Sequence, residues 1–146
     1  MNSGHATELS ILRTAALLAA LLLGAGLSTG LSAQELKTGE QVYKETCFAC
    51  HATGAAGAPK FGDKKKWAPL IKEGQSVLTA HAWVGVRGMP AKGGKADLSL
   101  EEFARATAYM ARAAGGTWKD PDAKALSRIR EEEQERRNML KAKKQP

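Results

Sequence analysis

Two cysteines and a histidine stand at a spacing that supports a specific chemistry. Cys47-Phe-Ala-Cys50-His51 is the C-x-x-C-H pattern of covalent haem attachment. Two thiols three residues apart can each add to one of the two haem vinyl groups, and the histidine that follows can offer a ring nitrogen to the iron. The motif therefore predicts one covalently attached haem c, with His51 as an axial ligand of its iron.

Three other uses of neighbouring cysteines fit the sequence less well. A structural zinc site needs about four ligands, and after residue 33 the only further histidine or cysteine is His81. A thioredoxin-like dithiol would be surrounded by βαβ elements, and no such pattern flanks Cys47 and Cys50. A disulfide between these two would close too short a loop to stabilise the chain appreciably.

The other axial ligand of the iron must come from elsewhere in the chain, and Met89 is the predicted one. It lies in an irregular Gly/Pro loop, residues 85–94, which can bring a thioether over a flat cofactor. Met110 and Met139 compete with it, although Met110 falls at core spacing in a predicted helix and Met139 lies among charges. His81 would give bis-histidine ligation, but it falls in another predicted helix.

The elements that must position these side chains are all helical. Ser99 and Glu102 form a capping-box signature at one helix start, and Gly115-Gly116 ends that helix. No alternating apolar pattern of strand type appears in the middle of the chain, so the predicted fold class is all-α. The predicted helices are residues 39–47, 67–73, 76–84 and 100–114.

The length of the chain limits the size of the domain that these helices form, and its charge limits the kinds of partner. Of the 146 residues, the aromatic ones cluster between the two ends, which leaves a core domain at residues 34–119. A domain of roughly eighty residues is marginally stable alone, so a large apolar ligand such as haem would help it. The net charge of +7 comes from scattered basic residues among acids, which does not suggest a nucleic-acid binder.

The N-terminal residues 1–33 are predicted to be a signal peptide. Residues 14–33 carry no charge and follow Arg13, and the apolar part proper, residues 15–23, is shorter than a membrane span. Cleavage is expected near Ala33. The alternative is an uncleaved membrane anchor, in which case the protein would be membrane-associated. Either way the rest of the chain is expected in the periplasm.

The C-terminal residues 120–146 are predicted to be a charged helical tail. Pro121 suits the first helical position, and two Glu–Arg pairs stand four residues apart in the favourable order. These pairs are Glu132 with Arg136 and Glu133 with Arg137. Apolar residues are too sparse for a continuous core stripe, so we expect a solvated helix projecting from the domain. Its removal is expected to leave the haem spectrum and the melting temperature nearly unchanged.

A larger set of residues between Gly39 and Met110 forms a specific combination with the haem motif. It comprises Gly39, Val42-Tyr43, Ala52-Thr53-Gly54, Gly57-Ala-Pro-Lys60, Gly62-Asp63, Trp67, Gly88-Met-Pro90, Lys92-Gly-Gly94, Leu98-Ser99 and Tyr109-Met110. This combination resembles the bacterial cytochrome c5 family of class I c-type cytochromes. The resemblance implies a class I cytochrome c fold, with about four helices around one covalent haem, to which this chain adds the charged C-terminal helix.

The resemblance also implies roles for individual residues. The first and last core helices should cross at Gly39 and Tyr109. The Pro59 carbonyl should accept a hydrogen bond from the His51 ring, and Trp67 should pack beside a haem propionate. The chain departs from the family in three places. Many members have a proline at the position of Ala91 and an arginine at that of Leu70, and some carry a further cysteine pair within residues 95–98.

The function implied is that of a periplasmic mono-haem electron carrier, with His51 and Met89 as metal ligands. Such a protein is not an enzyme, and its expected partners are redox proteins with an acidic docking surface. The alternative is a cytochrome c subunit of a periplasmic oxidoreductase, such as a dehydrogenase or a sulfur-oxidising complex, in which the partner performs the chemistry.

Overall fold

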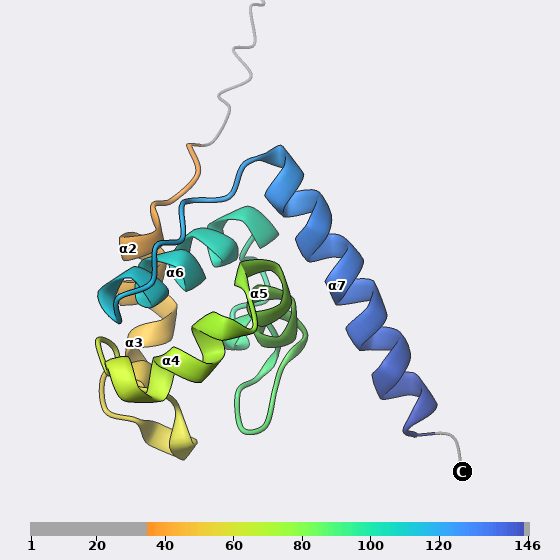
Figure 1. The fold of residues 1–146 in the computed structure, drawn as a ribbon, viewed down its shortest axis with the longest axis horizontal. Coiled ribbons are helices and arrows are strands. Elements are labelled where there is room, and N and C mark those ends of the chain that lie inside the picture. Colours follow the sequence, from red (N-terminus) through yellow and green to blue (C-terminus); the bar gives the residue numbers. More distant parts are fainter. Residues whose placement is uncertain (1–34, 145–146) are drawn as a thin grey trace, which may run out of the picture. The chain divides into compact units, whose positions relative to one another are not determined.

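A computed structural model describes residues 35–144. Residues 1–34 and 145–146 lie outside the described part, and with them the predicted signal peptide at residues 1–33. The described residues form helices joined by loops, with a single isolated bridge between Val86 and Met89 and no strand. The all-α prediction is therefore confirmed (Figure 1). No helix within residues 35–144 is long and apolar enough to cross a membrane.

The cysteine motif lies at the end of one continuous helical segment. This segment consists of α2 (Gly39–Val42), the π-helical η1 (Tyr43–Cys47) and α3 (Phe48–His51). Thr38 begins it with a capping box, since its hydroxyl accepts the Gln41 N–H while the Gln41 side chain accepts the Thr38 N–H. The helix predicted over residues 39–47 is thus present and continues through the motif.

The last core helix, α6 (Leu100–Ala113), begins as predicted. The Ser99 hydroxyl accepts the Glu102 N–H at 3.2 Å, and the Glu102 carboxylate accepts the Ser99 N–H at 3.1 Å. Helix α2 crosses α6 at Gly39, where an added Cβ would overlap the Arg105 carbonyl and lie 3.0 Å from the Tyr109 Cβ. The predicted crossing at Gly39 and Tyr109 is confirmed.

Two further helices come between these in the sequence, and both are labelled in Figure 1. Helix α4 (Lys64–Lys72) begins three residues earlier than predicted, because the Asp63 side chain caps it by accepting the Lys66 N–H at 3.1 Å. Helix α5 (Gln75–Val84) matches the prediction within one residue. Two short 3-10 turns, η2 (Ala55–Gly57) and η3 (Ala91–Gly94), lie in the two long loops.

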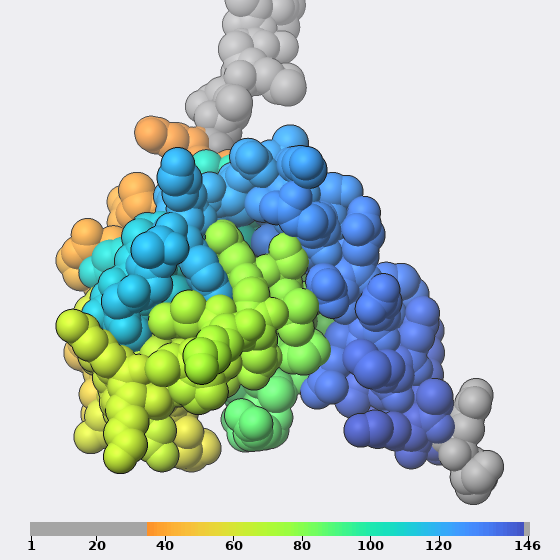
Figure 2. Space-filling view, viewed as in Figure 1, coloured from red at the N-terminus to blue at the C-terminus, as the bar shows by residue number. Residues whose placement is uncertain are grey.

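The C-terminal segment forms α7 (Ala123–Ala142), and its first half is not the solvated projection that we expected. Ile129 is fully buried and Leu126 nearly so, and they pack with Ala80 of α5 and Ala104 of α6. The expectation was wrong because two apolar residues are enough to pack α7 against the domain when the neighbouring helices present small alanine side chains at the contact. Helix α7 packs mainly along α5, and the space-filling view shows its first turns continuous with the domain surface (Figure 2).

Two details of α7 also differ from the sequence prediction. Asp122 caps the helix by accepting the Ala125 N–H at 2.7 Å, so Pro121 precedes the cap instead of occupying the first helical position. Glu133 pairs with Arg137 at 2.8 Å as expected. Arg136, the predicted partner of Glu132, behaves differently from Arg137. Its Nε atom is buried without a hydrogen-bond partner in the described part of the chain. The buried face of α7 therefore extends past Leu126 and Ile129 to part of the Arg136 side chain.

Candidate functional site

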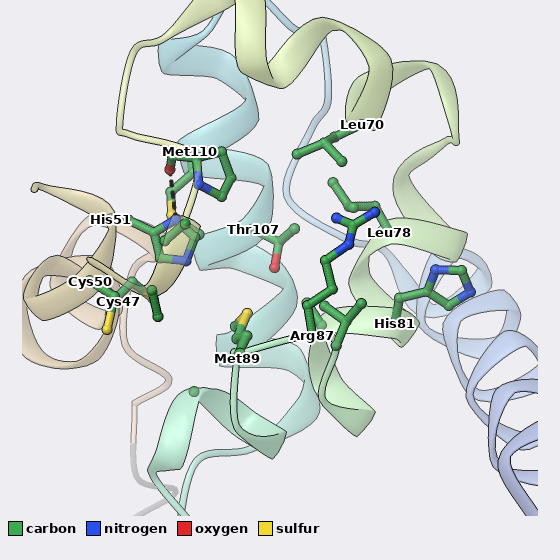
Figure 3. Close-up of a pocket in the computed structure, with 18 of the residues that line it drawn as sticks. Cys47, Cys50, His51, Leu70, Leu78, His81, Arg87, Met89, Thr107 and Met110 are labelled. Atoms are coloured by element: carbon green, nitrogen blue, oxygen red, sulfur yellow. Dashed lines mark hydrogen bonds between the residues drawn. The ribbon is translucent and has the colours of Figure 1, made fainter. Parts of the chain in front are cut away.

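The residues of the cysteine motif border a cavity inside the helical domain. Cys47, Cys50 and His51 line it together with Met89. The cavity encloses about 210 Å³, more than tenfold the roughly 15 Å³ that a single water molecule needs. His51 enters it from α3 and Met89 from the facing loop (Figure 3). The fold thus brings the four predicted attachment and ligand residues to one site.

The two cysteines differ in their surroundings. Cys47 is buried and Cys50 is exposed, and neither forms a disulfide. Burial, with a smaller contribution from neighbouring Cys50, raises the pKa of the Cys47 thiol to about 11. Redox-active dithiols need a thiol whose pKa is lowered, and the pKa of the buried Cys47 thiol is shifted in the opposite direction.

The orientation of His51 is set by a backbone carbonyl. Its ring is 7% exposed, and its Nδ1 lies 2.9 Å from the Pro59 carbonyl oxygen, which accepts a hydrogen bond from the protonated Nδ1 (Figure 3). In the neutral tautomer that makes this bond, the lone pair of Nε2 is free for a metal. The Pro59 loop therefore prepares His51 as a ligand through the contact that the resemblance implied.

Trp67 forms part of the wall near His51. It is 3% exposed and lines the cavity, and its ring centroid lies 6.3 Å from that of His51. Its indole N–H donates to the Lys60 carbonyl at 2.8 Å. Because this bond already uses the only polar atom of the indole, Trp67 can contact a cofactor through its ring but has no free donor for it.

Met89 is held in place by a tight turn. The Val86 N–H donates to the Met89 carbonyl at 3.1 Å, and the Met89 N–H donates to the Val86 carbonyl at 2.9 Å. Of the competing ligands, Met139 is half-exposed on α7 and does not line the cavity, whereas Met110 is buried and lines it. His81 is also on the lining, but its ring faces Glu73 at 3.7 Å.

Several lining residues were not singled out as site residues from the sequence. The inner face of α6 contributes Phe103 and Thr107, whose spacing with Met110 was interpreted as core packing only. The Thr107 hydroxyl donates to the Phe103 carbonyl at 3.0 Å, so its proton is not available to a ligand. The remaining residues missed include Thr46, Leu70, Leu78, Ala82 and Arg87. Helical spacing alone does not show which of the helical residues among them face a ligand, and Arg87 lies in a loop that has no such spacing.

The donor set of the cavity fits a haem better than a bare metal ion. Between residues 35 and 144, no three His, Cys, Asp or Glu side chains gather in the manner of a metal site. A haem supplies four porphyrin nitrogens to its own iron, so it requires only two axial protein ligands. Paired thiols, an oriented imidazole, a thioether and apolar walls meet this requirement.

Comparisons with known proteins point in the same direction. A family model described as "Cytochrome C oxidase, cbb3-type, subunit III" matches residues 34–110. Cytochrome c-555 of Chlorobaculum tepidum is 42% identical over 101 residues, which cover 66% of this chain and 91% of that protein. Cytochrome c5 of Azotobacter vinelandii is 38% identical over 76 residues, which cover 51% of this chain and 92% of that protein.

A solved structure extends the similarity to three dimensions. It is described as "Crystal structure of electron transfer complex of nitrite reductase with cytochrome c", and one of its chains is 42% identical to this one. The TM-score is 0.51, and the match covers 55% of this chain and 99% of that chain. The family model ends at residue 110, so α7 lies outside its match.

Proposed function

The chain belongs to the class I c-type cytochromes, whose cofactor is a covalently attached haem c, and on that basis we propose that it is a periplasmic mono-haem electron carrier. The haem, when bound, supplies one-electron chemistry at its iron. Cys47 and Cys50 would attach it, His51 and Met89 would ligate the iron, and Pro59 and Trp67 would hold the His51 side of the cofactor. The protein itself performs no reaction on a substrate.

The observation that carries this proposal is that His51 and Met89 border the same cavity from different elements. Occupation of both axial positions leaves no site for oxygen or a substrate on the iron and raises its reduction potential. The apolar walls from α5 and α6 exclude water from the cofactor. Cys50 and Phe48 are exposed, so a haem attached at Cys50 would have this attachment point at the surface, where an electron could enter or leave.

Covalent attachment can be tested with the two cysteines. In cells with a periplasmic haem-attachment system, the wild-type protein is expected to run on denaturing gels as a haem-staining band. Changing Cys47→Ser and Cys50→Ser together should remove that stain, because no thioether can form. The His81→Gln variant serves as control and should keep the stain. A wild-type band without haem, or staining of the double variant, would contradict the proposal.

Exposed lysines support docking of an acidic redox partner. Between residues 35 and 119, thirteen lysines and arginines outnumber eight acids. The exposed lysines of this part include Lys44, Lys60, Lys64, Lys65, Lys66 and Lys72. A positive field of this kind attracts anionic partners and is screened over roughly 10 Å at 0.1 M salt.

This field can be measured without knowing the partner. The rate of oxidation of the reduced protein by anionic ferricyanide should fall as salt concentration rises, while oxidation by a cationic cobalt(III) complex should become faster. The opposite signs follow because salt screens attraction in the first case and repulsion in the second. Rates that are indifferent to salt with both reagents would indicate an apolar docking surface.

A second candidate function is that of a cytochrome subunit in an oxidoreductase complex. Two findings favour it: the description of the matching family model names an oxidase subunit, and the similar solved chain is described in a complex with nitrite reductase. Size-exclusion chromatography of the protein released from its native periplasm separates the two functions. A carrier elutes as a small protein, whereas a subunit elutes with its enzyme.

A further inference from the structure

Charged side chains are rare on the lining of the cavity. Apart from the haem-attachment motif, the ionisable residues there are Glu73, His81 and Arg87. Glu73 and His81 face each other, with 3.7 Å between the His81 Nδ1 and the Glu73 carboxylate. Arg87 is the one permanently charged cation on this lining, and within the described chain it takes part in no ion pair.

The chemistry of the cofactor places its carboxylates on the side of the cavity where Arg87 lies. A haem carries its vinyl groups and its two propionates on opposite edges of the porphyrin. With the vinyl edge attached to Cys47 and Cys50, the propionates point away from α3. Figure 3 shows the Arg87 guanidinium on this far side, directed toward Leu70 and Leu78.

The leucines toward which Arg87 points, and the acidic residue on the same cavity lining, cannot themselves stabilise a carboxylate. Leu70 and Leu78 offer no donor, and Glu73 is of the wrong charge. Arg87 is exposed as well as lining the cavity, so a carboxylate held here would lose only part of its hydration, and a charged donor would replace the hydrogen bonds that the leucines cannot supply. A guanidinium meets this need well, because its parallel N–H groups match the two oxygens of a carboxylate.

The backbone of this loop aims Arg87 at the cavity. Its φ is +53°, a left-handed conformation that residues other than glycine rarely adopt. The paired hydrogen bonds between Val86 and Met89 enclose Arg87 in their turn and hold this conformation. The same turn thus presents the Met89 thioether and the Arg87 guanidinium to one cavity.

We propose that Arg87 binds a propionate of the haem, as a cofactor-binding residue that the C-x-x-C-H motif does not reveal. This inference rests on the proposed function, since it requires the covalent haem. A cation beside the cofactor favours the reduced iron, which carries one positive charge less than the oxidised iron. Arg87 therefore raises the reduction potential in addition to anchoring the haem.

The test compares two substitutions that each remove one positive charge from the holoprotein. Arg87→Gln removes the guanidinium from the lining. Lys95→Gln removes a lysine at the end of the same loop, which pairs with Asp97 at 3.1 Å and does not line the cavity. Spectroelectrochemical titration is expected to show a lower reduction potential for Arg87→Gln, and a clearly smaller change for Lys95→Gln.

Equal shifts in the two variants, or no shift in either, would overturn the role of Arg87. A crystal structure of the holoprotein tests independently whether Arg87 contacts a propionate. We expect a guanidinium nitrogen within about 3.2 Å of a propionate oxygen, and a guanidinium turned away from both propionates would refute the assignment. Either failure in a protein that retains its covalent haem leaves the proposed function intact, whereas a wild-type protein without haem refutes the proposed function itself.

Discussion

Replacing Met89 with alanine is expected to abolish the weak far-red absorption band of iron–thioether bonding in the oxidised protein. The variant should also bind cyanide or imidazole rapidly, because the vacated axial position becomes open to small ligands. The reduction potential should fall by on the order of 0.1 V or more, since axial ligands set haem potentials over a range of about 0.8 V. Absorption spectra measure the loss of the band and the binding of small ligands, and potentiometric titration measures the reduction potential.

Met110 provides the matched control for this experiment, because it also lines the cavity. Met110→Leu conserves volume in a buried position that is 4% exposed, so it is expected to keep the far-red band and to cost less than about 1.5 kcal/mol of stability. If the band instead survives in Met89→Ala and disappears in Met110→Leu, Met110 is the ligand. If both variants keep the band, neither Met89 nor Met110 is the ligand.

The second large effect, a loss of stability, is expected where α7 packs against α5 and α6. Ile129→Ala removes a fully buried side chain that packs with Ala80 and Ala104, and such changes cost about 2–5 kcal/mol. For a domain of this size the melting temperature should fall by roughly 10 °C or more. Deletion of residues 120–146 is expected to destabilise the protein further, contrary to the expectation from the sequence. Thermal unfolding followed by circular dichroism measures both.

Met139→Ala is the matched control on the same helix. Its side chain is 49% exposed, so the free energy of unfolding should change by no more than about 0.5 kcal/mol. Equal melting temperatures for Ile129→Ala and Met139→Ala would show that α7 does not pack on the domain in solution.

Local signals in the sequence predicted the core helices well. The capping box at Ser99 and Glu102 depends only on residues within one helical turn, and both of its hydrogen bonds are present. The apolar pattern that begins at Trp67 predicts the start of α4 three residues late, because the helix begins at its cap, Asp63, ahead of that pattern. Pro121 likewise suits a first helical position by residue type, but the helix begins one residue after its cap, Asp122.

The sequence by itself determined the chemistry at the cysteine motif and the positions of most helices. Thiol spacing, a following histidine and helix caps are local features, so a few consecutive residues suffice to specify them. The candidate ligand set of His51 and Met89 was also named from the sequence, with Met110, Met139 and His81 left as alternatives. The fold removes Met139 from the lining of the cavity and retains Met110 there.

Only the tertiary structure decided which surfaces meet. The burial of Ile129 depends on Ala80 and Ala104, which are small residues in two other helices, and no pattern within residues 120–146 contains that information. The direction of Arg87 depends on a left-handed backbone closed by the bonds between Val86 and Met89. Hydrophobic periodicity predicts that a side chain is buried. Whether that side chain packs against another helix or against a cofactor depends on contacts between residues that are distant in the chain.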